Sequence, residues 1–209
     1  MTRTDHDREG VWRAALELAW EAYCAGTIPV GAAITDVDGT VLATGRNRIH
    51  DTDAPVGQIF GSRVAHAEIN ALVQLPVTRT YRECTLWTTL EPCAQCVTAA
   101  WTSSIGRVAY AAPDVYAGAS KLVEREREAT DRVRTFPMAV DGPVAGATAL
   151  LAELLVVSHF VERRPGHHVT EAVCELRPDL VALAEVVRLT ELVKLPLAAV
   201  EATVLAARG

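Results

Sequence analysis

The sequence predicts one compact α/β domain followed by a helical appendage, and three observations lead to this prediction. The chain has 209 residues, of which 50% are hydrophobic and 22% charged, enough apolar side chains to fill a globular core. From residue 66 onward, helix-like and strand-like segments alternate, as in α/β folds. Residues 179–208 carry only helical patterns. We therefore expect a main domain at residues 1–165 and a C-terminal helical extension at residues 166–209.

The first expected elements are a helix and a β-hairpin. Residues 11–23 carry apolar side chains at three- and four-residue spacing, which is typical of an amphipathic helix. In the segment "IPVGAAITDVDGTVLATGRN", the pair Asp38-Gly39 supplies the positive backbone angle that a tight turn needs. Two strands are therefore expected around this turn, at residues 30–35 and 41–45.

A long loop and then an alternation of helices and strands should follow. Residues 48–65 are rich in Gly, Pro and Asp and lack a helical period, so we expect a loop, and loops of this length tend to be functional. After this loop, helices are expected at "HAEINALVQL" and "AQCVTAAWTSS", and strands at "CTLWTTL" and "IGRVAYAAP", in alternating order. A helix at residues 119–130, a weaker strand at residues 132–139 and a helix at residues 144–161 should complete the domain.

The tail at residues 179–208 shows two apolar helical patterns that are separated by Pro196. Charges of both signs recur on one side of these patterns, which favours a helical hairpin that packs on its own domain or on a second subunit. The alternative is a helix that binds a membrane surface or a partner. The polar face lacks the Lys and Arg richness that such helices usually show.

Charge and cysteine content narrow the function further. The formal net charge is −6 and the pI is about 5.5, so a long nucleic-acid partner is disfavoured. The first residues precede no apolar signal region, and no run of 18 or more apolar residues is free of charges, so we expect a cytoplasmic protein with no membrane partner. Five cysteines, an odd number without an export signal, favour reduced thiols or metal ligands over disulfides.

Two short segments, "HAE" at residues 66–68 and "PCAQC" at residues 92–96, indicate a zinc site. Cys93 and Cys96 are three residues apart, so a helix that starts at Pro92 would present both thiols on one face of its first turn. The positive end of that helix favours the thiolates that bind zinc. His66 can supply a third ligand. Three protein ligands and a fourth position filled by water are the pattern of catalytic zinc.

Glu68 lies two residues from His66, and neighbours at this spacing point apart on a regular helix, so Glu68 fits beside the zinc-bound water better than as a ligand. A carboxylate in this place can move a proton from that water to a substrate nitrogen, which is the chemistry of hydrolytic deamination. The H-x-E and P-C-x-x-C signature is that of the zinc nucleobase deaminases. A structural zinc site with Cys84 as fourth ligand would need the strand before Leu90 to bend, because six residues of strand span roughly 20 Å.

Five segments appear in order that resemble the bacterial tRNA adenosine deaminase and guanine deaminase branch of the cytidine deaminase superfamily: "IPVGAAI", "GRN", "AHAEINAL", "TLEPCAQC" and "SSIGRVAYAAPDVYAGA". The resemblance spans roughly residues 8–164. It implies a three-layer α/β/α sandwich around a five-stranded mixed sheet, usually as a dimer or a larger assembly, so a homodimer is expected. It also implies that His66, Cys93 and Cys96 hold Zn²⁺ and that Glu68 shuttles protons.

The resemblance also implies substrate contacts. Asn47 should hydrogen-bond the base or sugar of the substrate, Val30 should wall the base pocket, and Asp114 is the aspartate of the loop "PDVYAG". Tyr116 stands where the tRNA enzyme carries a basic residue, and the loop 48–65 is longer than expected for that enzyme. Two further departures are a basic C-terminal helix reduced to "HFVERRP" and a tail that the family pattern does not cover.

Simpler roles remain open for several residues. Asn47 could only cap a turn. Cys24, Cys84 and Cys174 are expected as core thiols, and Trp87 and Trp101 as core aromatic residues. The remaining histidines are expected in loops or on the surface; they are His50, His159, His167 and His168. His50 is nevertheless kept as a candidate substrate contact, because the long loop should lie near the pocket.

Three functions follow from these observations. The leading hypothesis is a zinc-dependent aminohydrolase that deaminates a free nucleobase or nucleoside and releases ammonia. The alternative is deamination of the tRNA wobble adenosine to inosine, which the motifs favour and the acidic charge disfavours, because tRNA binding must neutralise several phosphates. A non-catalytic zinc-stabilised subunit is the third hypothesis, and the presence of Glu68 argues against it. The identity of the base is left open.

Overall fold

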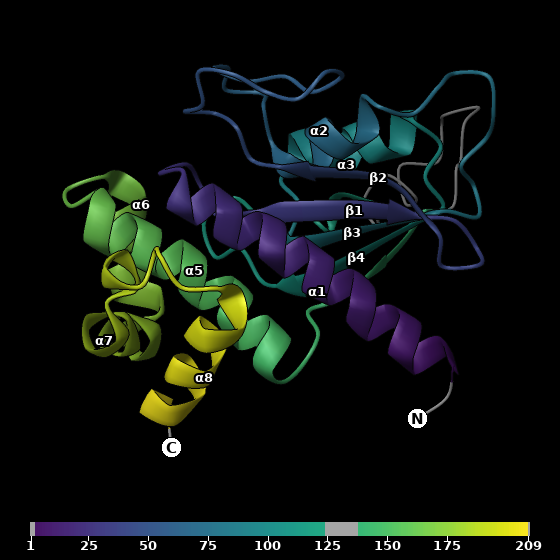
Figure 1. The fold of residues 1–209 in the computed structure, drawn as a ribbon. Helices are drawn as coiled ribbons and strands as arrows, with labels where there is room; N and C mark the ends of the chain where they lie inside the picture. Colours follow the sequence, from purple (N-terminus) through teal and green to yellow (C-terminus); the bar gives the residue numbers. More distant parts are fainter. Residues whose placement is uncertain (1–2, 124–137, 209) are drawn as a thin grey trace.

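A five-stranded mixed β-sheet lies at the centre of the computed structural model, which describes residues 3–123 and 138–208 (Figure 1). The strand order is β2-β1-β3-β4-β5. The strands are β1 Gly31–Thr35, β2 Val41–Arg46, β3 Thr85–Leu90, β4 Arg107–Ala112 and β5 Ala139–Asp141. β1 pairs antiparallel with β2 and with β3, whereas β4 pairs parallel with β3 and with β5. The expected mixed sheet is confirmed.

Helices cover both faces of this sheet. Figure 1 shows α2 (Ala67–Leu72) and α3 (Ala94–Thr102) on one face, and α1 (Arg3–Cys24) and α5 (Ala147–Arg163) on the other. β1 is buried along its whole length because it lies between the two helical layers. The core contains apolar side chains from every layer, among them Leu16, Ile34, Leu86, Val97, Val108, Leu154 and Leu155. The three-layer α/β/α sandwich is therefore confirmed.

Two glycines allow the helices to approach the hairpin closely. A Cβ atom at Gly31 of β1 would overlap the backbone of α1 at Ala15, and one at Gly45 of β2 would overlap the backbone of α2 at Ala67. Backbone atoms cannot move aside as a flexible side chain can. The distance between each helix and the sheet thus depends on the missing side chain at these positions.

The predicted hairpin turn is present. Gly39 has a φ of +84°, and the Asp36 carboxylate accepts hydrogen bonds from the backbone N–H groups of Asp38 at 3.0 Å and Thr40 at 2.9 Å. Residues 48–65, after the hairpin, contain no helix or strand, as expected.

The parallel pairing of β3 and β4 determines where a site can form. Their register places Leu90 beside Ala112, so the carboxyl ends of both strands lie at one edge of the sheet. The pairing continues one residue further, because the N–H of Glu91 donates to the carbonyl of Ala112 at 2.7 Å. The chain then leaves β3 directly into α3. Open parallel sheets commonly bind ligands at this edge.

The tail forms α6 (His168–Leu176), α7 (Pro178–Val187), the 3₁₀ turn η1 (Leu189–Glu191) and α8 (Leu197–Arg208). It packs on its own domain. Arg13 of α1 forms an ion pair with Glu201 at 2.8 Å, and the Trp20 indole donates to the carbonyl of Leu195 at 3.0 Å. The Glu162 carboxylate of α5 accepts hydrogen bonds from the N–H groups of Leu189 and Thr190. The division between residues 165 and 166 stays a prediction.

Several expectations about local structure need correction or lie outside the described residues. α6 was not named among the expected helices, although it lies within the expected helical extension and four of its apolar side chains, Val169, Ala172, Val173 and Leu176, follow helical spacing. Cys24 and Cys174 are exposed, so the expectation that they are core thiols was wrong, whereas Cys84 is buried. Most of the expected helix 119–130 and strand 132–139 falls outside the described part. No helix among the described residues is long and apolar enough to cross a membrane.

Gly31→Ala tests the packing of α1 on the sheet. We expect this variant to lower the free energy of unfolding by roughly 1–3 kcal/mol, because the added methyl group meets helix backbone. The matched control is Gly10→Ala, whose added Cβ meets nothing within 4 Å and which should stabilise α1 by about 0.5–1 kcal/mol. Urea unfolding measures both variants. Equal midpoints for the two would contradict the assignment.

Candidate metal centre

Two helix N-termini meet at the carboxyl edge of β3 and β4. His66 is the N-cap residue of α2, Cys93 is the N-cap residue of α3, and both have extended backbone. Cys96 lies in the first turn of α3 and is fully buried. The helix starts at Ala94, two residues later than expected from Pro92. The two thiols nevertheless face the same point.

The three side chains are spaced as zinc ligands are. The Sγ atoms of Cys93 and Cys96 are 3.7 Å apart, and the Nδ1 atom of His66 lies 3.6 Å from Cys93 Sγ and 3.4 Å from Cys96 Sγ. Tetrahedral zinc with ordinary bond lengths requires about 3.8 Å between sulfurs and about 3.6 Å between sulfur and nitrogen. His66, Cys93 and Cys96 also form the metal-binding group found among the described residues. The donor set therefore fits Zn²⁺.

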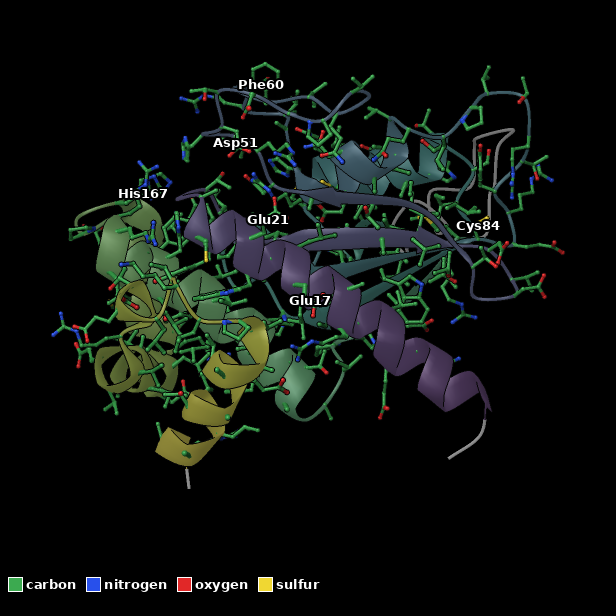
Figure 2. All side chains as sticks on the ribbon, in the orientation of Figure 1. Glu17, Glu21, Asp51, Phe60, Cys84 and His167 are labelled. Atoms are coloured by element: carbon green, nitrogen blue, oxygen red, sulfur yellow. The ribbon has the colours of Figure 1, made fainter. Side chains whose placement is uncertain are left out.

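Cys84 takes no part in this cluster. It lies just before β3 begins, whereas Cys93 lies beyond the other end of that strand (Figure 2). Cys84 is buried within the hydrophobic core. A fourth thiol ligand is thus excluded among the described residues, and the cluster has the three-ligand composition of catalytic zinc sites.

The ionisation of the two thiols is coupled. The Cys96 thiol lowers the pKa of Cys93 to about 4, His66 adds to this effect, and burial opposes it. Cys93 in turn raises the pKa of Cys96, and burial raises it further. The hydrogen bond with Cys93 raises the pKa of His66, against burial. The cluster therefore favours the thiolate form of Cys93, which is the form that binds metal.

Glu68 lies beside this cluster on the first turn of α2. It is only 4% exposed, and its carboxylate accepts a hydrogen bond from the Thr88 hydroxyl at 3.2 Å. Burial raises the pKa of Glu68, and the nearby His66 opposes that rise. Thr88 lies on β3, so strand and helix together hold the carboxylate. Sequence reasoning missed Thr88, which no local motif marks.

A cavity of about 510 Å³ opens at the metal cluster. Seven of the eight residues expected in the site line it: Val30, Asn47, His50, His66, Glu68, Cys93 and Asp114. The eighth, Cys96, lies behind them in the cluster. Trp87 and Trp101 were expected in the core. Both are partly buried and pack against the hydrophobic core, and neither lines this cavity. The structure therefore brings all the expected site residues together.

Asn47 is held in one orientation. Its Oδ1 atom accepts hydrogen bonds from the Thr27 hydroxyl at 2.8 Å and from the N–H of Ile49 at 3.1 Å. A backbone N–H can only donate, so the oxygen must face this way. The amide nitrogen of Asn47 has no partner among the described residues and can donate into the cavity. The N–H of His50 donates to the same Thr27 hydroxyl at 3.4 Å, which places His50 beside Asn47.

Asp114 serves mainly to shape its own loop. Its carboxylate accepts hydrogen bonds from the N–H groups of Tyr116 at 2.9 Å and Ala117 at 3.0 Å. Burial raises the pKa of Asp114, whereas these backbone bonds lower it. Glu91 then ties the loop to the metal cluster, because its carboxylate accepts from the N–H of Asp114 and from the hydroxyl of Ser120. Sequence reasoning missed Glu91, although its place before Pro-Cys in "EPC" could have drawn attention to it.

His159 departs most from expectation. It was expected in a loop or on the surface, but it lies on α5, is 1% exposed and lines the cavity. Neither ring nitrogen has a hydrogen-bond partner among the described residues. Burial lowers the pKa of His159 to about 3, and the neighbouring Arg164 and Arg163 add to this effect. His159 is therefore neutral at physiological pH.

Comparisons with known proteins agree with this geometry. Residues 5–112 match the family model for the cytidine and deoxycytidylate deaminase zinc-binding region. The chain is 35% identical to a cytosine deaminase from Candida albicans over 124 residues, which are 57% of this chain and 75% of that protein. It is 36% identical to a tRNA(Ile)-lysidine synthase from Deinococcus radiodurans over 108 residues, 50% of this chain but only 17% of the relative's length.

A solved structure shares the fold. It comes from a study of A-to-I editing by tRNA:A34 deaminases and superposes with a TM-score of 0.52 at 25% identity. The match covers 70% of this chain and 99% of that structure. The family match ends at residue 112, so α5 and the tail lie beyond it.

Cys93→Ser tests the metal cluster. The wild-type protein purified with zinc should contain about one zinc ion per chain, and the variant should lose most of it, because the cluster needs all three ligands. Cys84→Ser is the matched control and should keep its zinc, since Cys84 lies outside the cluster. Metal content is measured by mass spectrometry. Full zinc occupancy in Cys93→Ser would overturn the ligand assignment.

His159 should make stability depend on pH. Its pKa is about 3 in the folded protein and about 6.5 when unfolded, so only the unfolded state binds this proton at intermediate pH. The free energy of unfolding should therefore fall as pH falls from about 6.5 to about 5, by up to about 1.4 kcal/mol per pH unit from this group. Urea unfolding of zinc-loaded wild type and His159→Gln should show the shallower slope in the variant. Identical slopes would show that His159 is not buried as a neutral group.

Proposed function

The chain belongs to the cytidine and deoxycytidylate deaminase family, and on that basis we propose that it is a zinc-dependent hydrolytic deaminase of a small nucleobase-containing molecule. The reaction replaces the amino group on a ring carbon with oxygen from water and releases ammonia. The observation that supports this proposal best is the position of Glu68. This carboxylate lies buried beside a three-ligand metal cluster and lines the same cavity as Asn47.

Each residue of the site has a role in this reaction. His66, Cys93 and Cys96 would hold the zinc ion, whose chemistry is the activation of a water molecule as nucleophile. Glu68 accepts a proton from the attacking water and passes it to the ring nitrogen of the substrate. It then takes the second proton from the hydroxyl group added to the ring carbon and delivers it to the departing amine, so that ammonia leaves as the carbonyl forms. Thr88 keeps the carboxylate in place through its hydrogen bond.

Asn47 and Val30 would position the base. The amide nitrogen of Asn47 can donate to an acceptor on the base or sugar, because Thr27 and Ile49 hold its oxygen away. Val30 is buried and presents an apolar wall to the same cavity. A flat base between an apolar wall and a fixed donor presents its amino-bearing carbon in one orientation. These contacts support a base-specific site.

The second candidate is deamination of the wobble adenosine of tRNA. The solved structure described above, from a study of tRNA:A34 deaminases, favours it. The net charge of −6 and the tyrosine at position 116 favour a small substrate instead. We retain the homodimer and the cytoplasmic location as further parts of the proposal.

An ammonia-release assay separates these functions. Zinc-loaded protein is incubated with free bases, nucleosides, nucleoside monophosphates and deacylated tRNA, and ammonia is measured. Turnover of a small molecule supports the proposal, and turnover of tRNA alone replaces it with the second candidate. Absence of ammonia from every substrate would favour a non-catalytic zinc-stabilised subunit.

Glu68→Gln tests the proton shuttle. This variant keeps the size of the side chain and the hydrogen bond to Thr88 but removes the base, so kcat should fall by about 10²–10⁴-fold. Zinc content and the melting temperature, measured alongside, should stay close to those of the wild type, because Glu68 is not a ligand. Undiminished kcat would assign the proton transfer to another group.

A further inference from the structure

The cavity has a second end that the metal cluster and Asn47 do not explain. It is lined by α5 and the corner between α5 and α6, which lie beyond the family match. This part of the lining carries four basic groups, His159, Arg164, His167 and His168, together with Glu153 of α5, and the long loop adds His50. Figure 2 shows His167 where α5 and α6 meet, on the side of the molecule that carries Asp51 of the loop.

These basic groups lie close to one another. The rings of His167 and His168 are 4.1 Å apart between centroids, and the His168 ring lies 5.3 Å from that of Tyr116. Arg164 lines the same cavity as His159 and His50, and its positive charge lowers the pKa of both imidazoles. The loop after β2, the loop after β4 and the α5–α6 corner therefore surround one volume.

His159 gives an independent indication that this volume holds a ligand. The side chain is buried and lines the cavity, and neither nitrogen is satisfied by a described residue. An unpaired buried polar group costs about 1–3 kcal/mol, so such groups usually have a partner. A neutral imidazole can donate one hydrogen bond to that partner. The partner must reach His159 from the cavity.

The charge at this end remains uncompensated. Arg164 forms no ion pair with a carboxylate of the described residues. The acids that line the cavity are occupied elsewhere. Glu153 pairs with Arg177, Glu91 holds the loop through Ser120, and Asp114 binds backbone N–H groups. The fourth acid, Glu68, lies at the metal cluster and accepts from Thr88. A guanidinium beside an imidazole donor and no free carboxylate favours an anionic ligand.

We propose that Arg164, His159 and His167 bind the phosphate of a nucleoside 5′-monophosphate, whose base lies at the metal cluster. The inference rests on the proposed function, because it names the substrate class of that site. Asn47 and His50 both line the cavity and bind the same Thr27 hydroxyl, so this pair would contact the ribose. The volume of about 510 Å³ suits a ligand larger than a free base, since cavities for ligands of drug size measure about 300–1,000 Å³.

A terminal phosphate fits this end better than a phosphate within RNA. A phosphodiester must continue in both directions along its chain, whereas α5, α6 and the loop that carries Tyr116 border this end on several sides. A monoester phosphate carries up to two negative charges at neutral pH and offers three acceptor oxygens. Arg164, His159 and His167 can supply donors to these oxygens.

Binding to a variant that turns over only slowly tests this inference. Zinc-loaded Glu68→Gln protein is titrated by calorimetry with adenosine, guanosine and cytidine and with their 5′-monophosphates. One monophosphate should bind at least about tenfold more tightly than its nucleoside, as expected for a charge-assisted hydrogen bond. Adding Arg164→Gln should abolish this difference while leaving nucleoside affinity unchanged.

Two further variants complete the test. His167→Asn removes the imidazole but keeps an acceptor for the N–H of Val169, which His167 caps at the start of α6, so it should weaken monophosphate binding without unfolding the helix. Arg8→Gln is the matched control. It removes the same charge from an exposed position on α1, outside the cavity, and should keep the full preference for the monophosphate.

The outcomes separate this inference from the proposed function. Equal affinity for nucleoside and monophosphate, together with ammonia release by the wild type, overturns the phosphate site and leaves the deaminase intact. An Arg164-dependent preference without ammonia release supports the site and rejects the reaction. Binding of an anticodon stem-loop RNA but of no monophosphate would assign the basic groups to a polynucleotide and overturn the inference.

Discussion

The parallel pairing of β3 with β4 is the constraint on which the rest of the structure depends. It brings the ends of both strands to one edge of the sheet and directs the chain after Leu90 into α3, so that Cys93 and Cys96 meet His66 at the start of α2. A slip of one residue in this register would turn alternate side chains to the other face of the sheet and separate the ligands. The buried side chains of β3 and β4 oppose such a slip, because both faces of these strands pack against helices and side chains moved to the other face would no longer fit.

Burial of polar groups at this edge has a cost that the local structure offsets. Glu68 and Asn47 are almost fully enclosed, yet each is held by hydrogen bonds from residues outside the cavity, Thr88 for the first and Thr27 for the second. A buried carboxylate with one partner is less stable than a solvated one, and its pKa rises for that reason. A site that keeps such groups must gain from them in function, since an apolar core would be more stable.

The segment beyond the family match helps to form the cavity. The family match ends at residue 112, but α5 and α6 contribute a large part of the cavity wall. They are held in place by hydrogen bonds to each other and to the tail: the Thr170 hydroxyl of α6 donates to the carbonyl of Phe160 in α5, and Glu162 of α5 accepts from the N–H groups that begin η1. Differences in substrate among related folds can therefore arise outside the region that carries the chemistry.

The sequence by itself determined the α/β order, the hairpin at Gly39, the metal ligands and the position of Glu68, because these depend on short-range spacing and on turn and helix chemistry. It did not reveal the burial of His159, the exposure of Cys24, or the roles of Thr88 and Glu91. Those properties depend on which surfaces the tail covers and on which strands lie side by side, and only long-range packing decides them. Local pattern specifies a side chain's chemistry, whereas its solvent exposure and its partners come from segments distant in the chain.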